Sequence, residues 1–351
     1  MALNVGIVGL PNVGKSTIFN ALTIKKVPAE NYPFCTIEPN QGIVAVPDSR
    51  LLQIDAIAHS SKIVPSIIEF IDIAGLVKGA AVGEGLGNKF LSHIREVDAI
   101  LHVVRAFQDD EIIHVEGRVD PKDDIAIISM ELALKDLETI EKLISNELKS
   151  QKAGKKESAK RIELFEMTRE LLQKDMDPNQ SLTLEDKLII KDANLLSLKP
   201  KIYVLNVSDN DLQREFDFPF PYIKVSARLE AELVDFTQDE KKEYLEMAGI
   251  EYSGLEQIIK ESYKSLNLIN FFTEGPDEIR SWTIQNGNTA PQAAGVIHTD
   301  FMNKFIRLEV VQYTDFIAFK GWDQAKQNGT MRSEGKEYIV KDGDIVIVRH
   351  S

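Results

Sequence analysis

Eight residues near the start of the chain have the types and spacing of a phosphate-binding loop. Residues 9–16, GLPNVGKS, follow an apolar segment and precede the helix-like stretch Thr17–Leu22. Glycines let backbone N–H groups converge on a phosphate at a helix N-terminus, where the helix dipole also favours negative charge. In such loops the lysine bridges the β- and γ-phosphates and the hydroxyl binds Mg²⁺. The sequence therefore predicts a triphosphate site made by Asn12, Val13, Gly14, Lys15, Ser16 and Thr17.

Two later motifs narrow the class of protein. Residues 72–75, DIAG, match DxxG, in which the carboxylate of Asp72 holds Mg²⁺ through water and the Gly75 N–H meets the γ-phosphate. Residues 31–36, NYPFCT, lie between the two motifs, and Thr36 is placed to complete the Mg²⁺ coordination shell. The predicted metal-binding residues are Ser16, Thr36 and Asp72. The neighbouring Cys35 is interpreted as a passive small residue, with a redox-sensitive thiol as the alternative.

The predicted base pocket departs from the guanine-reading pattern NKxD. Residues 206–209 read NVSD, so Val207 stands where a lysine stem would lie along the base. The carboxylate of Asp209 can accept hydrogen bonds from guanine, whereas adenine presents a lone pair at N1 that would repel it. Taken alone, the residues leave adenine and guanine both open. The pocket is predicted to comprise Asn206, Val207 and Asp209, together with Ser226, Ala227 and Arg228 after the strand-like Tyr222–Val225.

Short apolar segments rich in β-branched residues must position these motifs. They are separated by helix-like stretches, which is typical of buried parallel strands in an α/β domain with crossover helices. The predicted strands are Val5–Val8, Ile67–Ile71, Ile100–Val104 and Ile202–Leu205.

A helical hairpin is predicted to interrupt this α/β domain. Between Ile125 and Leu148 apolar residues recur at three- and four-residue spacing, Gly154 can end the helix, and a second helical stretch follows. The apolar positions are Met130, Leu134, Leu137, Ile140, Ile144 and Leu148 in the first helix, and Leu164, Met167, Leu171 and Leu172 in the second.

The turn of the hairpin is basic within an acidic protein. It holds six basic residues against Glu157 alone, namely Lys149, Lys152, Lys155, Lys156, Lys160 and Arg161. Either this tip contacts phosphate backbone, or it is a solvated loop kept soluble by its charge.

Composition and the end of the chain set the remaining expectations. The chain has 351 residues, a net charge of −14, one cysteine and no apolar run long enough to span a bilayer. These features and the lack of a basic, signal-like start predict a cytoplasmic protein that does not enter a membrane.

From about Ile269 the sequence predicts a small β-rich domain with strands at Arg307–Gln312, Glu337–Val340 and Ile345–Arg349.

Together these motifs resemble the YchF/Obg-like ATPase family of P-loop proteins. The resemblance rests on GLPNVGKST, NYPFCTIEPN, DIAGLVKGA, GEGLGNKFLSHIREVDAI and NTAPQAAGVIHTDF. It implies an α/β P-loop NTPase G domain (1–120 and 200–268), an inserted α-helical coiled-coil hairpin (121–199) and a C-terminal TGS domain of ubiquitin-like β-grasp form (269–351). It also implies hydrolysis of ATP at least as well as GTP, and association with ribosomes. The family usually carries Asn-x-x-Glu at the base motif, where this chain has Asp209.

Catalysis departs from Ras-like switches, in which a glutamine after DxxG orients the attacking water. Leu76 occupies that place here, as the family pattern also implies, and it cannot hydrogen-bond water. The predicted catalytic residues are therefore Lys15, Gly75 and His114, the last as a proton acceptor near pH 7 with a structural histidine as the alternative. Asn12 matches the asparagine that holds K⁺ in related cation-dependent GTPases.

Two functions remain open from the sequence. One is a Mg²⁺-dependent ATPase switch, with GTP as a further substrate, that binds the ribosome through the basic tip and the C-terminal domain. The other is a ribosome-binding adaptor that nucleotide only stabilises. We expect a monomer in either case.

Overall fold

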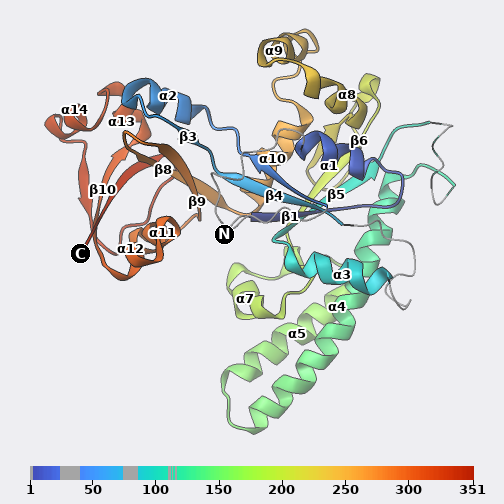
Figure 1. The fold of residues 1–351 in the computed structure, drawn as a ribbon. Coiled ribbons are helices and arrows are strands. Elements are labelled where there is room, and N and C mark those ends of the chain that lie inside the picture. Colours follow the sequence, from blue (N-terminus) through green and yellow to red (C-terminus); the bar gives the residue numbers. More distant parts are fainter. Residues whose placement is uncertain (1–2, 24–39, 74–85, 110–111, 113, 115–116) are drawn as a thin grey trace.

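The computed structural model describes residues 3–23, 40–73, 86–109, 112, 114 and 117–351. An α/β domain and a smaller β-rich domain lie side by side, and a long helical hairpin projects from the first (Figure 1). Thr36 and Gly75, which the sequence predicts in the metal and catalytic sets, lie outside the described residues, as do Cys35 and Leu76.

The first sheet has the strand order β2-β4-β1-β5-β6-β7, in which β2 is antiparallel to β4 and the other pairs are parallel. Every residue of the central strand β5 is buried, because helices cover both faces of the sheet. All the strands predicted for this domain are confirmed. Their bounds are Leu3–Val8 (β1), Gln41–Ala45 (β2), Ile67–Asp72 (β4), Ala99–Arg105 (β5), Lys201–Asn206 (β6) and Tyr222–Val225 (β7).

Helices α1, α8 and α10 lie on one face of this sheet, and α3 and the start of α4 lie on the other (Figure 1). Side-chain caps fix where several begin: Ser226 accepts the Leu229 N–H before α8, and Thr237 forms a capping box before α9. The bounds are Lys15–Thr23 (α1), Leu86–Glu96 (α3), Ala227–Glu232 (α8), Gln238–Met247 (α9) and Gly254–Ser265 (α10), with 3₁₀ turns at Asp209–Asp211 (η3) and Leu233–Asp235 (η4).

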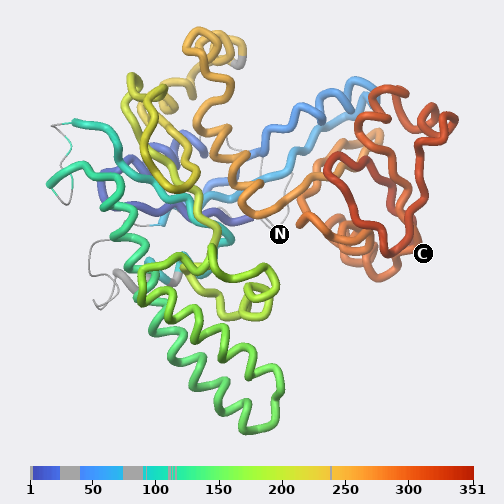
Figure 2. The backbone as a smooth tube through the Cα atoms, turned by 180° about the vertical axis from the view of Figure 1, so that it is seen from behind, coloured from blue at the N-terminus to red at the C-terminus, as the bar shows by residue number. Residues whose placement is uncertain are grey.

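The predicted hairpin is confirmed. Helix α4 (Pro121–Lys152) and helix α5 (Glu157–Gln173) run antiparallel, as Figure 2 shows from behind. Asp120 caps α4 by accepting the N–H groups of Lys122 and Asp123, and Gly154 turns the chain with a φ of 93°. The short elements α6 (Pro178–Ser181), α7 (Leu184–Ile189) and η2 (Lys191–Ala193) return the chain to β6.

The predicted apolar stripe of α4 is wrong at three positions, because Met130, Leu134 and Leu148 are exposed. The helix is 32 residues long and packs on two different cores. Its first half inserts Ile128 and Leu132 into the core of the first sheet, whereas Ile140 and Ile144 pack against α5. Because the buried face changes between the two halves, no single stripe describes it.

The second sheet has the order β11-β10-β12-β8-β9-β3, in which β3 is Ile63–Val64 and β12 and β8 form a central parallel pair. A β8-β9 hairpin, a helix and then β10 and β12 in this order are the arrangement of a β-grasp domain. Its strands are Leu268–Glu274 (β8), Ile279–Gln285 (β9), Phe305–Gln312 (β10), Arg332–Glu334 (β11) and Asp344–His350 (β12). Its helices are Ala290–Ile297 (α11), Thr299–Asn303 (α12), Tyr313–Ala318 (α13) and Trp322–Gln327 (α14).

The strand predicted at Glu337–Val340 is wrong. This segment makes one isolated bridge, from Ile339 to Thr289, and only its first residue, Glu337, lies in a turn. Tyr338 instead connects other elements, since its carbonyl accepts the Ala290 N–H at the start of α11 and its hydroxyl donates to the carboxylate of Asp344 at 2.8 Å.

Part of the predicted first domain packs against the second sheet. Helix α2 (Ser49–Ala58) buries Leu51 and Ile54 in the core beside Phe272 and Phe316, and β3 (Ile63–Val64) pairs with β9. The segment between β2 and β4 therefore reaches out of the α/β domain and completes the edge of the β-rich sheet.

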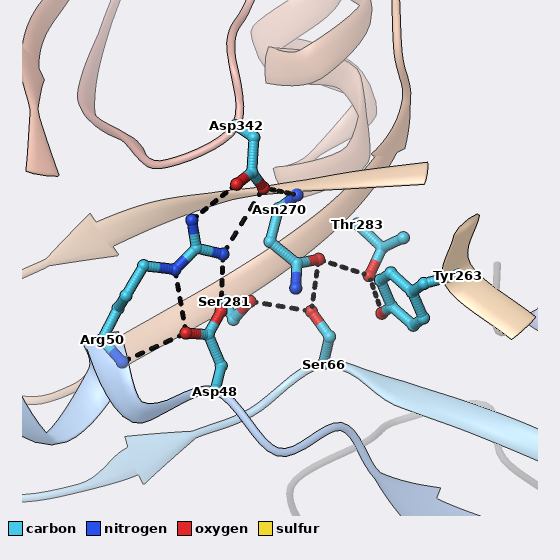
Figure 3. Close-up of polar contacts among 8 residues, drawn as sticks. All are labelled: Asp48, Arg50, Ser66, Tyr263, Asn270, Ser281, Thr283 and Asp342. Carbon is cyan, nitrogen blue, oxygen red and sulfur yellow. Dashed lines mark hydrogen bonds and ion pairs between the residues drawn. The ribbon is translucent and has the colours of Figure 1, made fainter. Parts of the chain in front are cut away.

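A polar network fixes this junction, as Figure 3 shows. The Arg50 guanidinium donates to Asp48 beside it and, at 2.7 Å, to Asp342 of the second domain. The Ser66 hydroxyl lies 3.3 Å from Asn270 Oδ1 and 2.9 Å from the Ser281 hydroxyl, and the Tyr263 hydroxyl lies 2.6 Å from that of Thr283. The polar side chains at the interface therefore satisfy one another across it.

Candidate nucleotide site

The loop between β1 and α1 has the backbone shape that its glycines predict. A β-carbon on Gly9 would lie 2.3 Å from the carbonyl oxygen of Val103, so only glycine fits against the neighbouring strand. Asn12 and Gly14 adopt φ values of 61° and 97°. This left-handed backbone lets the loop wrap around its own centre. The Lys15 ammonium is buried there and donates to the Leu10 carbonyl at 2.7 Å.

Asn206 clasps two loops of the site together. Its Nδ2 donates to the Val13 carbonyl at 2.9 Å, and its Oδ1 accepts the Ala227 N–H at 3.0 Å. We call these two hydrogen bonds the Asn206 clasp. Val13 is predicted to bind nucleotide, and in the structure its backbone carbonyl accepts the first bond of the clasp. Gly14 is required beside it, because a β-carbon there would lie 2.2 Å from Nδ2. The asparagine of the base motif therefore also fixes the phosphate loop.

The metal end of the site joins Ser16 to Asp72. The Ser16 hydroxyl donates to Asp72 Oδ2 at 3.2 Å, and Asp72 Oδ1 is buried without a partner among the described residues. Burial raises the pKa of Asp72, and the Ser16 hydrogen bond and the charge of Lys15 act in the opposite direction. A buried carboxylate oxygen that lacks a donor, beside a hydroxyl, fits a divalent cation or one of its bound waters.

The described residues contain no cluster of three or more His, Cys, Asp or Glu that could hold a metal by themselves. Mg²⁺ bound beside a nucleotide needs no such cluster, because phosphate oxygens and water complete a shell begun by one hydroxyl and one carboxylate. Ser16 and Asp72 fit that donor set.

One cavity of about 1140 Å³ joins the phosphate loop to the base motif. Most of the predicted binding residues line it together. They are Asn12, Gly14, Lys15, Ser16 and Thr17 at one end, and Asn206, Val207, Asp209, Ser226, Ala227 and Arg228 at the other. The cavity is large enough for a nucleotide.

Arg105, which belongs to none of the predicted motifs, shapes the wall of this cavity. Arg105, fully buried at the end of β5, donates to the carbonyls of Phe107, Asp109 and Ile112 at 3.2, 3.0 and 2.8 Å. Phe107, Asp109 and Ile112 line the cavity. The available signal was the arginine that ends the apolar strand AILHVVR, because a buried guanidinium needs several acceptors.

His114 is buried, and its Nε2 lies 3.0 Å from Asp124 Oδ2 in the first turn of α4. Burial raises the pKa of Asp124, and the hydrogen bond from His114 offsets part of that rise. His114 is not among the residues that line the cavity, so its catalytic role stays a prediction.

The basic tip is smaller than predicted, because Arg161 faces the inside of the hairpin. Its guanidinium binds Glu147 and Asp192, both at 2.8 Å, and the Ile189 carbonyl at 2.6 Å. The exposed basic residues are Lys149, Lys152, Lys155, Lys156 and Lys160.

Within the described part of the chain, every helix is too short or too polar to cross a lipid bilayer.

Comparison with known proteins gives matches along the whole chain. Residues 4–140 match the family described as 50S ribosome-binding GTPase, and residues 268–351 match YchF-GTPase_C, described as a protein of unknown function. The chain is 48% identical to the ribosome-binding ATPase YchF of Bacillus subtilis, over 99% of both chains. It is 46% identical to the protein of that name from Escherichia coli O157:H7, over 99% of this chain and 98% of the other. The solved structure of the Schizosaccharomyces pombe YchF GTPase matches with a TM-score of 0.86 and 40% identity, over 99% of this chain and 97% of that one.

Proposed function

The chain belongs to the YchF family of P-loop NTPases, and we propose that it is a Mg²⁺-dependent ATPase switch that binds the ribosome. In this proposal ATP is the preferred substrate, GTP is a weaker one, and the protein works in the cytoplasm. The observation that carries the proposal is the phosphate end of the cavity. There Lys15 and Ser16 line the cavity, and the Ser16 hydroxyl donates to Asp72, whose other carboxylate oxygen is buried without a partner among the described residues.

The residues of the chain divide the work of binding. The N–H groups of the loop would surround the β-phosphate at the start of α1, and Lys15 would exchange its bond to the Leu10 carbonyl for the β- and γ-phosphates. Burial lowers the pKa of Lys15, and an anionic ligand beside it would favour the charged ammonium that burial disfavours. Bound Mg²⁺ would neutralise charge that develops on the phosphate oxygens. Ser16 and Asp72 would hold that ion, with Thr36 and Gly75 as further proposed ligands of the metal and the γ-phosphate.

Nucleotide binding by Ser16→Ala tests the metal end of the site. We expect Mg²⁺-dependent ATP affinity to fall by at least about tenfold, since a metal ligand is lost. Ser208→Ala is a matched control, because Ser208 lines the same cavity but donates to Asp211 rather than toward the phosphates. Equal affinity of Ser16→Ala and the native protein for Mg·ATP would contradict the proposed site.

The monovalent-cation part of the proposal concerns Asn12. This residue is exposed, lines the cavity and holds a left-handed φ of 61° at the turn of the loop. We expect K⁺ to raise the hydrolysis rate above that in Na⁺ and Asn12→Ala to remove the difference. Equal rates in the two salts would exclude a K⁺ site here.

Ribosome binding is proposed to use the exposed lysines of the hairpin tip. Lys155→Glu with Lys156→Glu should weaken binding and flatten its salt dependence, because fewer counterions are released from phosphates. Lys242→Glu with Lys260→Glu is the control, since it reverses two exposed lysines outside both the hairpin and the C-terminal domain. If the tip variant bound ribosomes as tightly as the native protein, these lysines would only keep the loop soluble.

Single-turnover hydrolysis with and without ribosomes separates the switch from the adaptor. A switch predicts stimulation by ribosomes and a ribosome affinity that depends on the bound nucleotide. An adaptor predicts neither.

A further inference from the structure

The two carboxylate oxygens of Asp209 have different partners inside the protein. The Ser226 hydroxyl donates to Oδ1, and the Arg228 guanidinium donates to Oδ2. All three residues line the base end of the cavity. Asp209 is the better covered member of the ion pair, with 29% of its side chain exposed against 75% for Arg228. The acceptor that the sequence offers to a base is therefore already engaged.

The surroundings favour this pairing. Besides Asp209, the base end of the cavity holds the carboxylates of Glu232 and Asp235, and Arg228 is the cation among the described lining residues there. The hydrogen bond that Arg228 donates to Asp209, and then the charges of Asp209 and Glu232, raise the pKa of Arg228. The guanidinium is thus attracted to this wall by several negative charges.

Donor and acceptor positions differ between the two purines. Guanine presents N–H donors at N1 and at its 2-amino group, and reading both needs both oxygens of one carboxylate. Adenine presents a bare acceptor at N1. A carboxylate only accepts and a guanidinium only donates. A guanidinium over Oδ2 therefore removes half of the surface that reads guanine and offers N–H groups that adenine N1 can accept.

We propose that Arg228 is a specificity-determining residue that masks Asp209 from guanine and presents a donor to adenine. The inference deepens the proposed preference for ATP and rests on it. It assigns the choice of base to an ion pair across the pocket, where the base motif alone leaves both purines open.

Competition binding with Arg228→Met tests the assignment. Methionine keeps an unbranched apolar stem but cannot donate a hydrogen bond. We expect the ratio of Kd for Mg·GTP to Kd for Mg·ATP to fall by roughly tenfold, since a charge-assisted hydrogen bond is exchanged for an unmasked acceptor. Arg214→Met is the matched control. It removes an arginine whose guanidinium lies 3.7 Å from Asp211 on the same 3₁₀ turn, outside the cavity lining, and should leave the ratio unchanged.

A second measurement uses the native protein and inosine triphosphate, which lacks the 2-amino group of guanine. If Asp209 is masked, Mg·GTP and Mg·ITP bind the native protein with similar Kd, and Arg228→Met binds Mg·GTP more tightly than Mg·ITP. Tighter binding of GTP than ITP by the native protein, by tenfold or more, would overturn the inference even if the variant did not fold. An unchanged Kd ratio in a folded Arg228→Met that still binds ATP would also overturn it. Failure of the native protein to bind any of these triphosphates would instead overturn the proposed function.

Discussion

At the residue scale, the phosphate loop and the base motif form one unit rather than two independent sites. Asn206 holds the carbonyl of Val13 and the N–H of Ala227, and it fits only because Gly14 has no side chain. Both bonded groups are backbone atoms in a buried place, where an unpaired polar group costs about 1–3 kcal/mol. A change on either side of this contact is therefore felt in both loops.

Gly14→Ala is expected to cost more than backbone strain alone. A left-handed alanine costs about 1–2 kcal/mol, and displacing the Asn206 clasp adds about 1–3 kcal/mol. Gly154→Ala is the matched control, because Gly154 has nearly the same φ, 93° against 97°, and open space around it. Unfolding in urea should show the larger loss for Gly14→Ala, accompanied by loss of ATP binding. Equal losses for the two variants would contradict the clasp.

At the element scale, buried polar groups hold the hairpin in place. Asp136, on α4 between its two cores, accepts the N–H groups of Leu196 and Ser197 at 2.9 and 2.7 Å and the Ser197 hydroxyl at 2.6 Å. These bonds attach the middle of α4 to the segment that leads into β6. Farther out, Arg161 joins α5 to α4 through Glu147 and to the returning chain through Asp192. The hairpin is thus fastened at two levels along its length.

Arg161→Met should weaken the hairpin by about 1 kcal/mol at neutral pH, as expected for ion pairs that water partly screens. The hydrogen bond from Arg161 lowers the pKa of Asp192 below 3.8. The Ser158 hydroxyl first, and then Arg161, lower the pKa of Glu147 below 4.5. Because both carboxylates have a lower pKa in the folded state, their charged forms stabilise the fold at pH values above the ordinary pKa. This stabilisation is lost as the pH falls through the lowered pKa values.

The difference in unfolding free energy between the native protein and Arg161→Met should therefore shrink as the pH falls below about 4. Thermal unfolding across pH measures it. Lys160→Met, which removes only an exposed pair with Glu163, is the control and should differ little from the native protein at any pH. A difference for Arg161→Met that stays constant down to pH 3 would exclude these carboxylates as its cause.

At the scale of the whole molecule, the connection between β2 and β4 links the two large domains. Strand β4 ends at Asp72 in the nucleotide site, while α2 and β3, between β2 and β4, belong to the core and edge of the second sheet. The network of Figure 3 ties this connection to the second domain through Arg50 and Asp342. The Arg50 guanidinium also lies 4.9 Å from the centre of the Phe272 ring. The second domain is therefore attached to the first through the segment between β2 and β4, and β4 ends in the nucleotide site.

Arg50→Met should lower the free energy of unfolding by about 2 kcal/mol, because it leaves carboxylates at a partly buried interface without their cation. Limited proteolysis should cleave the connections between the domains faster in this variant. Arg349→Met is the control, since Arg349 pairs with Glu309 within the second sheet and not between domains. Equal cleavage rates in native protein and Arg50→Met would show that the apolar contacts of α2 hold the junction without the ion pairs.

The sequence by itself determined the features that local patterns encode. Runs such as Ile100–Val104 and Ile202–Leu205 predicted buried parallel strands because their burial on both faces requires an unbroken apolar segment. The spacing of glycine, lysine and serine in residues 9–16 predicted the phosphate loop because a glycine such as Gly14 permits the left-handed backbone that the turn requires. The hairpin followed from helical periodicity and a glycine at its turn.

Which distant residues meet depends on the three-dimensional fold. The lysines around Arg161 predict a place in the basic tip, yet its partner Asp192 lies 31 positions away. In the same way, α2 lies within residues 1–120, which the sequence assigns to the first domain, yet its apolar face packs beside Phe272 and Phe316 of the second. The pairing of Asp209 with Arg228 depends on two loops that follow different strands. Which charged side chains pair, and which apolar faces are buried, depends on the elements that pack together. A local sequence pattern cannot show which surface an element will pack against.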